Sequence, residues 1–242
     1  MRSARLCSLA LALLALPLAL GACVSGVNGS VDVAAGSSVS DASTVNGSVH
    51  VQAKARADKA STVNGSIEIG EGAQVGEATT VNGHVKLAQH ATAGSVDTVN
   101  GSITLGNDAT VSGNVTAVNG DLNLASGSAV NGALTNVNSH INIDGAHVGK
   151  GITTVNGDID ITGNAVVDGG IKVKKPNDNG VFGIHFGSNN IPTITIGPGA
   201  TVNGPLDFER PVKLYISDQA HVAGPITGAE AVKFSGATPP AS

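Results

Sequence analysis

Aromatic residues are scarce in this chain. They make up 2% of the 242 residues, with four Phe, one Tyr and no Trp. A compact globular core of this length normally takes much of its buried area from aromatic side chains. Between Val24 and Val173 there is no aromatic residue at all. This scarcity argues against one compact core and fits a fold built from many small, equal layers.

Cysteine and charge are also low. Cys7 and Cys23 are the only cysteines, and charged residues make up 13% of the chain, with a formal net charge of −5. Because basic runs are few, nucleic acid is an improbable partner. The seven histidines show no HxH or HExxH spacing, the acidic residues are scattered, and no phosphate loop is present. We therefore predict no enzyme, no metal and no cofactor.

The first residues read as an export signal rather than as part of the fold. Arg2 and Arg5 precede an apolar run from Leu9 to Leu20, which is too short for a membrane-spanning helix. The predicted signal covers residues 1–22. Its removal takes two arginines, so the 220 residues that remain carry a net charge of −7 instead of −5.

The sequence Leu20-Gly21-Ala22-Cys23 resembles the lipobox of bacterial lipoproteins. The resemblance implies cleavage before Cys23, a diacylglycerol on its sulfur and a further acyl chain, such as palmitate, on its amine. Such acyl chains would form a stable membrane anchor. Val24 in place of an aspartate favours the outer membrane in the proteobacterial lipoproteins that this segment resembles, without saying whether the protein faces the periplasm or the outside. An ordinary secretory signal with an accidental cysteine is the alternative.

An internal repeat dominates the rest of the sequence. The tripeptide VNG, or VNS once, recurs at intervals of 18, 18, 18, 18, 19, 19 and 18 residues, beginning at Val27, Val45, Val63, Val81, Val99, Val118, Val137 and Val155. Within it, every sixth residue from Val27 to Val111 is apolar. Three sixes make one coil of about 18 residues. The pattern predicts an all-β fold, a three-sided parallel β-helix (β-solenoid) of about ten coils spanning residues 23–173 and resuming later.

The repeat also predicts where its side chains lie. We expect the valine of each VNG to point into the core, and the glycine to allow a corner through positive φ or a tight bend. The asparagines, one per coil, should stack and hydrogen-bond along the axis. Threonines precede most of the valines, so Thr-x-Asn rows are expected to line one flat side. Such a side could order water and bind ice, although the strand propensity of threonine is the simpler explanation.

The pattern breaks near the end of the chain. Residues 174–192 carry turn signals without a period and predict a projecting loop. The period of six returns in residues 193–236, from Ile196 to Val232, and predicts further coils, followed by a proline-containing tail at 237–242. All five aromatics lie in this last quarter and are expected to cap the open end of the core. Alternatively, Phe182, His185 and Phe186 form a contact patch on the loop.

The repeated TVNGxIxI unit, with IGPGATVNGPL near the end, resembles two bacterial families. These are the adhesins of the β-strand-repeat, head-GIN type and the polymer-forming bactofilins, whose cores are three-sided β-helices. IGEGAQVGEATT, from Ile69 to Thr80, is similar to the hexapeptide repeat of left-handed β-helix acyltransferases. Later repeats place bulky residues at the small positions of that pattern, so the handedness stays open, with a right-handed coil favoured.

These observations predict a lipid-anchored structural or adhesin-like protein of the cell envelope without catalytic activity. Its partners would be the membrane, through the anchor, and a cell-surface glycan or protein or further copies of the chain. A self-assembling, bactofilin-like scaffold is the first alternative, and a carbohydrate-active β-helix enzyme is a remote one. An acyltransferase would need a base such as His84 or His140, but acyl-CoA is absent outside the cytoplasm.

Overall fold

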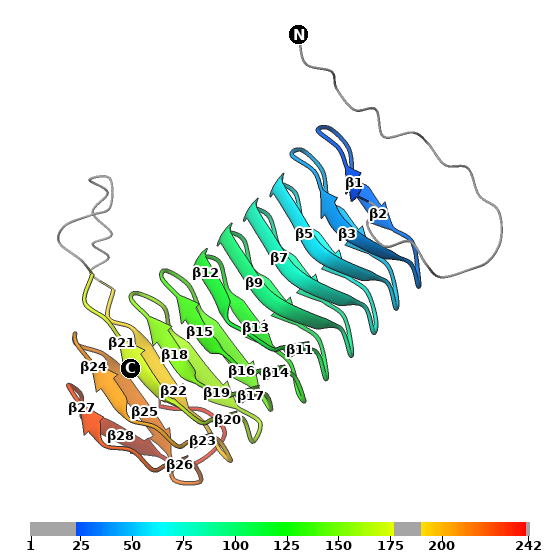
Figure 1. The fold of residues 1–242 in the computed structure, drawn as a ribbon. Coiled ribbons are helices and arrows are strands. Elements are labelled where there is room, and N and C mark those ends of the chain that lie inside the picture. Colours follow the sequence, from blue (N-terminus) through cyan, green and yellow to red (C-terminus); the bar gives the residue numbers. More distant parts are fainter. Residues whose placement is uncertain (1–22, 177–189, 241–242) are drawn as a thin grey trace.

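The computed structural model describes residues 23–176 and 190–240, and every regular element within them is a β-strand. The strands stack as coils of one long solenoid, from the blue N-terminal coil to the red C-terminal one (Figure 1). Adjacent coils pair in parallel, with partners 18 or 19 residues apart in most coils. Thr62 lies opposite Thr80, for example, and Ile103 lies opposite Leu122. The predicted all-β parallel solenoid is confirmed.

The strands of the coils form two hydrogen-bonded sheets. One sheet takes a single strand from each of eleven coils, one more than the approximate count expected: β2 (Val31–Val33), β4 (Val49–Val51), β6 (Ile67–Ile69), β8 (Val85–Leu87), β10 (Ile103–Leu105), β13 (Leu122–Leu124), β16 (Ile141–Asp144), β19 (Ile159–Thr162), β22 (Thr193–Ile196), β25 (Lys213–Ser217) and β28 (Ala231–Phe234).

The other sheet has seventeen strands. It takes a single strand from each of the first coils and two from most of the later ones: β1 (Cys23–Ser25), β3 (Ser38–Ser43), β5 (Arg56–Asn64), β7 (Gln74–Asn82), β9 (Thr92–Asn100), β11 (Thr110–Val111), β12 (Val115–Asn119), β14 (Ala129–Val130), β15 (Ala133–Asn136), β17 (His147–Val148), β18 (Gly151–Thr154), β20 (Val166–Val167), β21 (Gly170–Val173), β23 (Thr201–Val202), β24 (Leu206–Phe208), β26 (His221–Val222) and β27 (Ile226–Thr227).

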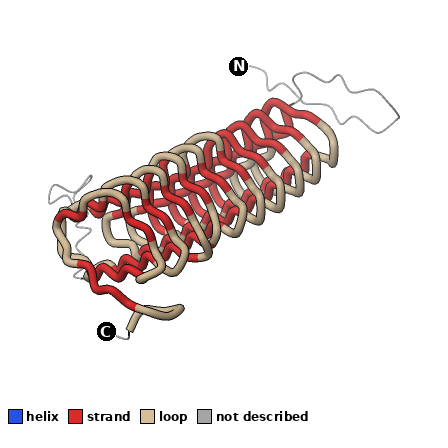
Figure 2. Tube along the Cα trace, turned by 90° about the horizontal axis from the view of Figure 1, so that it is seen from below, coloured by secondary structure: helices blue, strands red, loops and turns tan. Residues whose placement is uncertain are grey.

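The solenoid is a rod whose strands run across its length and are joined by turns at its edges (Figure 2). Parallel strands lie about 4.8 Å apart, so eleven coils span about 50 Å along the axis. Each coil closes around a share of one continuous apolar core. A single coil cannot bury its own inner face, so the fold is stabilised through contacts between neighbouring coils.

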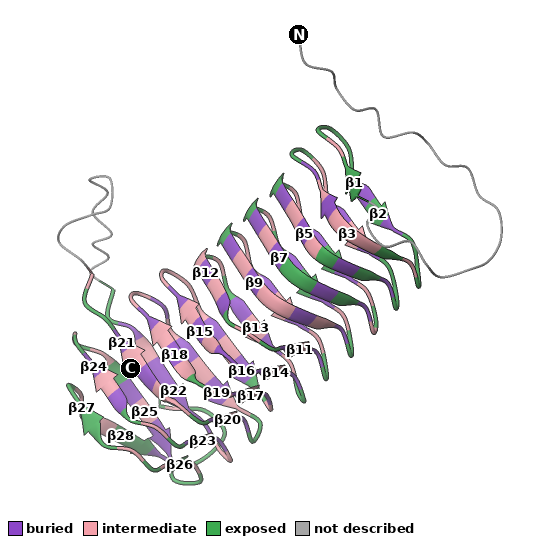
Figure 3. Ribbon diagram, in the orientation of Figure 1, coloured by how far each residue is buried: buried purple, intermediate pink, exposed green. Residues whose placement is uncertain are grey.

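Strand alternation explains most of the core. In β4, Val49 and Val51 are buried while His50 between them is not, and the three-residue strands β6 and β8 repeat this pattern. Figure 3 shows the same alternation of buried and more exposed positions from coil to coil. At these positions the period of six predicted the inward side chains correctly.

The VNG valines do not point inward, and this prediction was wrong. Val27 is 67% exposed, and Val45, Val63, Val81 and Val99 are 38–41% exposed. The cause is a bend in the long strands of the seventeen-stranded sheet. In β5, two outward residues, 58 and 59, separate the inward residues 57 and 60. Alternation is thereby shifted by one residue, so residue 62 faces the core and residue 63 faces out.

The threonines before these valines occupy the core positions instead. Thr44, Thr62, Thr80 and Thr98 are 1–5% exposed. Each hydroxyl donates to the carbonyl of a corner glycine, as Thr80 Oγ1 does to Gly65 O at 2.9 Å. A hydroxyl buried in this way keeps its hydrogen bond. The expected Thr-x-Asn surface rows, and the ice-binding surface built on them, are therefore not formed.

The corner glycines are required by space rather than by backbone torsion. A Cβ on Gly65, Gly83 or Gly101 would lie 1.9 Å from the carbonyl oxygen of the corner residue one coil earlier. None of these three has φ in the left-handed region. The close approach of stacked backbones therefore explains the glycine, and the expectation of positive φ is not met at these positions.

The one-residue insertions enter at the bend of the long strands. Thr92 pairs with Thr110 at a separation of 18 residues, whereas Val96 pairs with Val115 at a separation of 19. The extra residue lies in the segment 112–114, where the continuous strand of earlier coils divides into β11 and β12. The insertion is thus accommodated at a bend, and the sheet hydrogen bonds continue on both sides of it.

The solenoid continues beyond the predicted loop. Ile159 of β19 pairs with Ile194 of β22, so the coils before and after residues 174–192 stack directly on each other. Phe182, His185 and Phe186, the proposed contact patch, lie outside the described residues. Phe208 and Phe234 are each 5% exposed and close the core in the last coils, as expected of capping aromatics. Tyr215 does not follow this expectation, because it is only half-buried between the core residues Leu214 and Ile216 of β25.

The last positions of the period of six are not buried. Ile226 is 37% exposed and Val232 is 50% exposed, although both were expected to point inward. Ile226 lies in the last strand of the larger sheet, while Val232 faces outward in β28. The final coil is therefore only partly covered.

Candidate functional surface

Cys23, the residue predicted to carry lipid, is the first residue of β1. It lies opposite Asp41 of β3 in a parallel pair, and its side chain is exposed. Cys23 Sγ is 3.7 Å from Ser40 Oγ. The predicted lipid-bearing residue therefore belongs to the first coil of the solenoid, and no linker separates it from that coil.

A ladder of asparagine side chains runs along one corner of the solenoid. Each Nδ2 donates to Oδ1 of the asparagine one coil earlier, as predicted from the repeat. The seven hydrogen bonds join Asn46 to Asn28 at 3.0 Å, Asn64 to Asn46 at 2.9 Å, Asn82 to Asn64 at 3.0 Å, Asn100 to Asn82 at 2.9 Å, Asn119 to Asn100 at 3.0 Å, Asn138 to Asn119 at 2.8 Å and Asn156 to Asn138 at 2.8 Å. Because all donors point toward the N-terminal coil, the amide dipoles align and strengthen one another.

Arg210 binds the acceptor end of this asparagine ladder. Its Nη1 donates to Oδ1 of Asn156 and to Val155 O, the latter at 3.0 Å, and its Nη2 donates to Asn190 O at 2.8 Å. A guanidinium placed at the negative end of aligned amide dipoles is favourable. Arg210 thus ties a later coil to the end of the ladder.

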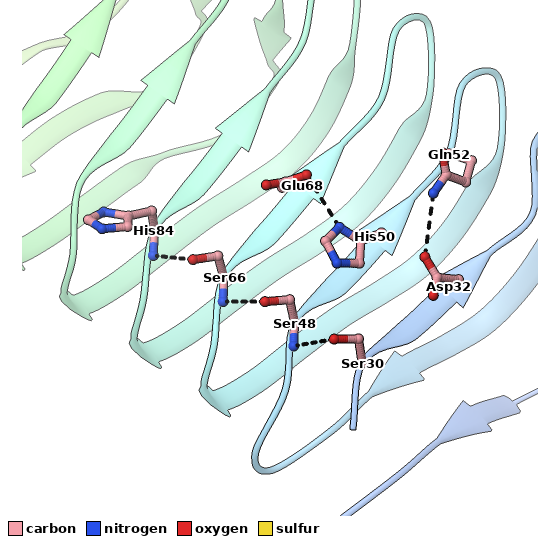
Figure 4. A network of polar contacts seen from close by, with 8 residues as sticks. All are labelled: Ser30, Asp32, Ser48, His50, Gln52, Ser66, Glu68 and His84. Atoms are coloured by element: carbon pink, nitrogen blue, oxygen red, sulfur yellow. Dashed lines mark hydrogen bonds and ion pairs between the residues drawn. The ribbon is translucent and has the colours of Figure 1, made fainter. Parts of the chain in front are cut away.

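A second ladder lies beside the first, on the residue that follows each VNG or VNS. The backbone N–H of one coil donates to the side chain of the same position one coil earlier (Figure 4). Six such bonds of 3.0–3.3 Å have the N–H groups of Ser48, Ser66, His84, Ser102, Asp121 and His140 as donors. The position therefore carries a side chain with a hydrogen-bond acceptor near the backbone, which Ser Oγ, Asp Oδ1 and His Nδ1 supply.

His84 serves in this second ladder as a hydrogen-bond acceptor. Its Nδ1 accepts from the backbone N–H of Ser102 at 3.0 Å, so that nitrogen carries no proton in this arrangement. The geometry gives His84 a role in coil stacking. Its position is explained without a role as a base for acyl transfer.

Histidines pair with carboxylates of a neighbouring coil at four places. The pairs are His50 with Glu68 at 3.3 Å, His90 with Asp108 at 3.9 Å, His140 with Asp160 at 3.1 Å and His147 with Asp168 at 2.7 Å. The hydrogen bond to Asp160 raises the pKa of His140 above its ordinary value of 6.5, although burial opposes the shift. Burial raises the pKa of Asp160, but hydrogen bonds from His140 and Thr195 outweigh it, and the net shift is downward.

An ion cluster links later coils. Lys172 Nζ lies 2.8 Å from Asp207 Oδ2 and 2.7 Å from Glu209 Oε1. These contacts raise the pKa of Lys172 and lower the pKa values of Asp207 and Glu209. The three side chains are 39–43% exposed, so solvent screens the cluster and its contribution to stability is small.

The VNG valines form an exposed row, here called the valine ridge, with the members Val27, Val45, Val63, Val81 and Val99. The ridge adjoins the asparagine ladder, since each ladder residue follows its valine in sequence. Nearly all of the large apolar residues that are exposed in the described part of the chain belong to this ridge or to the two ends of the solenoid. A regular apolar row of this length is a candidate contact surface.

Two hollows on the described surface, of about 280 and 170 Å³, are open to solvent and lined by short or polar side chains such as Gly76, Gly94, Gln52 and Glu68. Within residues 23–176 and 190–240, no group of three His, Cys, Asp or Glu side chains is arranged to hold a metal. The same residues contain no helix long and apolar enough to cross a membrane.

Comparisons with protein-family models, with curated protein sequences and with solved structures each found no match. The class is therefore defined by the fold itself. The chain is a repeat protein with a parallel β-solenoid of eleven coils, and an asparagine ladder joins successive coils along one corner.

Sequence reasoning missed Arg210 and the second ladder. The second ladder had a visible signal, because the residue after each VNG or VNS is Ser, His or Asp throughout the first eight coils. Arg210 had no visible sequence signal. It contacts Asn156 across an intervening coil and an irregular segment, so no repeat position marks it.

Proposed function

We propose that this protein is a lipid-anchored structural or adhesive component of the bacterial cell envelope, held at the outer membrane through Cys23. The observation that carries the proposal is the combination of the lipobox-like sequence with a rigid repeat surface. Cys23 opens the first coil with an exposed side chain, which leaves its sulfur accessible for attachment. A membrane and a cell-surface glycan or protein are the proposed partners, and no catalytic activity is proposed.

The shape of the surface supports a contact function over a catalytic one. Substrate sites are usually concave and enclose much of their ligand, whereas the two hollows described above are open to solvent. The valine ridge and the asparagine ladder instead present the same pair of side chains about every 4.8 Å along the rod. A repeated surface of this kind suits many weak, identical contacts, which add up through multivalency.

Metabolic labelling with a palmitate analogue tests the anchor. The full chain should incorporate the label and fractionate with outer membranes, and Cys23→Ser should lose both properties. Cys7→Ser is the matched control and should retain them. Labelling that persists in Cys23→Ser would contradict the anchor. Protease treatment of intact cells would then show which side of the membrane the solenoid faces.

Adhesion assays on whole cells test the contact function. A triple variant with serine in place of Val63, Val81 and Val99 should reduce attachment. A control triple variant from the same coils carries serine in place of Glu68, Lys86 and Thr104, the middle residues of β6, β8 and β10. Equal attachment by both triple variants and the parent would reject the valine ridge, and normal adhesion and envelope integrity in a deletion strain would reject the function.

A self-assembling scaffold is the second candidate, supported by the ends of the rod. β2 and β28 are the terminal strands of the eleven-stranded sheet, and Ile226 and Val232 are exposed at the C-terminal end. Open strand edges invite pairing with another chain, and a head-to-tail contact that does not close produces filaments. Electron microscopy of the purified chain distinguishes the two candidates, since filaments would support the scaffold and single short rods would exclude it.

A further inference from the structure

Asparagine followed by glycine is the sequence most prone to deamidation, and this chain is rich in it. Seven of the eight ladder asparagines from Asn28 to Asn156 are followed by glycine, Asn138 being the exception, and so are Asn131, Asn179 and Asn203. In the reaction, the glycine N attacks the asparagine Cγ, the Cγ–Nδ2 bond breaks and ammonia leaves. Water then opens the cyclic imide to aspartate or isoaspartate, so no oxidant or cofactor is needed.

The asparagine ladder opposes this reaction in two ways. An inner member such as Asn82 holds its Nδ2 on Asn64 and its Oδ1 on Asn100, so its carboxamide cannot rotate toward the backbone. The attacking nitrogen is also engaged, because Gly83 N donates to Asn100 O at 3.0 Å. These three hydrogen bonds must open locally before the ring can close.

Two Asn-Gly pairs lack part of this protection. In the described part of the chain, the side chain of Asn131 makes no hydrogen bond, and Gly132 N alone is held, by Gly113 O at 3.0 Å. Asn28, at the N-terminal end of the ladder, accepts from Asn46 but donates to no described residue. Both side chains are exposed, and so is that of Asn82. Hydrogen bonding, and not burial, separates the two groups.

Deamidation would also damage the structure more at an inner ladder position than at Asn28 or Asn131. An aspartate at an inner position cannot donate to the preceding coil, and its carboxylate would face the Oδ1 of that coil. Asn28 only accepts, and a carboxylate accepts the Asn46 amide at least as well. Asn131 stands outside the asparagine ladder, so its conversion leaves the ladder unchanged.

We propose that, among the Asn-Gly pairs in the described part of the chain, Asn131 and Asn28 are the sites that deamidate in the folded protein, and that the asparagine ladder protects the Asn-Gly pairs whose amides it needs. The protein therefore gains negative charge at two places that tolerate it while the stacked corner stays intact. This inference is independent of lipid anchoring and of adhesion.

Peptide mapping by mass spectrometry, with enzymatic detection of isoaspartate, tests the proposal on the full chain. The chain is incubated at mildly alkaline pH, folded in one sample and unfolded in urea in the other. In urea all Asn-Gly pairs should react at similar rates. In the folded sample Asn131 and Asn28 should react first among the Asn-Gly pairs of residues 23–176 and 190–240, while Asn64, Asn82 and Asn100 should slow by about tenfold or more relative to urea. Inner asparagines that react as fast as Asn131 in the folded chain would overturn the proposal.

Substitutions test the claim that an aspartate is tolerated at Asn28 and Asn131 but not at an inner ladder position. Asn28→Asp and Asn131→Asp should melt within about 2 °C of the parent, whereas Asn82→Asp should melt about 4 °C or more below it, because it loses a donor and gains repulsion. Asn28→Asp that destabilises as strongly as Asn82→Asp would reject the claim of tolerance. If Asn82→Asp does not fold, the mapping of the parent chain still decides the proposal.

Discussion

Substitution of a corner glycine tests how closely the coils approach. In Gly83→Ala the new Cβ would lie 1.9 Å from Gly65 O and 2.5 Å from Gly65 C, both backbone atoms. Since neither atom can rotate away, the two coils must separate at this corner by about 1 Å or more to reach ordinary contact. The separation strains two bonds between these coils, Gly65 N to Asn82 O and Asn82 Nδ2 to Asn64 Oδ1.

The expected cost follows from these two effects. Overpacking of a close contact costs about 1–3 kcal/mol, and each weakened hydrogen bond costs about 1 kcal/mol. A total of about 3 kcal/mol corresponds to a fall of about 10 °C in the melting temperature of a chain of this size. Thermal unfolding followed by far-ultraviolet circular dichroism measures this shift.

Ser139 provides the control, because it occupies the corner position of its own coil in place of glycine. Ser139→Ala keeps the Cβ that this coil already accommodates and should melt within about 2 °C of the parent. A Gly83→Ala variant that melts together with Ser139→Ala would refute the reasoning, since the backbones at the corner would then be further apart than described.

Further outcomes follow from other parts of the solenoid. Lys54 has φ of 59°, so Lys54→Gly should remove about 1 kcal/mol of strain and raise the melting temperature by about 2 °C, and an unchanged or lower value would contradict the strain. The raised pKa of His140 contributes stability that is complete below pH 6.5 and is lost as the pH rises through the folded-state pKa; melting curves of His140→Gln should lack this decline, and a slope equal to that of the parent would count against the pair. The core position two residues before the buried threonine is Ala60 in β5 and Ile152 in β18. The larger side chain adds about 2 kcal/mol of stabilisation through buried apolar surface. Amide exchange should therefore be slower in β18 than in β5, and uniform protection would disagree.

Much of the fold could be predicted from the sequence because the repeat makes each coil a copy of its neighbour. The repeat length, parallel stacking and the asparagine ladder all follow from identical residues at equal intervals. The eleven coils and the return of the solenoid after residue 192 also fit the period of six. In such a fold a contact that is right in one coil is right in most of them.

The direction of the VNG valines could not be predicted from the period alone. A spacing of six is even, so simple alternation places Ala57 and Val63 on the same side of the chain. The two successive outward residues at the bend of β5 change that parity, and they leave no mark in the hydrophobic pattern. Thr62 was not recognised as a core residue because its hydroxyl is satisfied by the carbonyl of Gly47, a contact that only the stacked corner creates.

Arg210 illustrates a second limit. It reaches Asn156 from a distance of 54 residues in the sequence, and the corner between them belongs to a coil in which Lys175 stands where the asparagine would be. Contacts that depend on where a repeat is interrupted have no counterpart in other coils. Such residues become visible only when the coils are assembled in space.

Disulfide trapping tests the stacking of successive coils most directly. In a chain with Cys7→Ser and Cys23→Ser, the pair Val63→Cys and Val81→Cys places one thiol on each of two adjacent coils. The Cα atoms of the two residues are then about 4.8 Å apart, which is within the Cα–Cα range that a disulfide can bridge. The pair Val63→Cys and Val99→Cys is two coils apart, at about 10 Å, which exceeds that range. Mild oxidation should close an intramolecular disulfide in the first variant and none in the second. Equal cross-linking in both variants, or none in the first, would contradict the stacked solenoid.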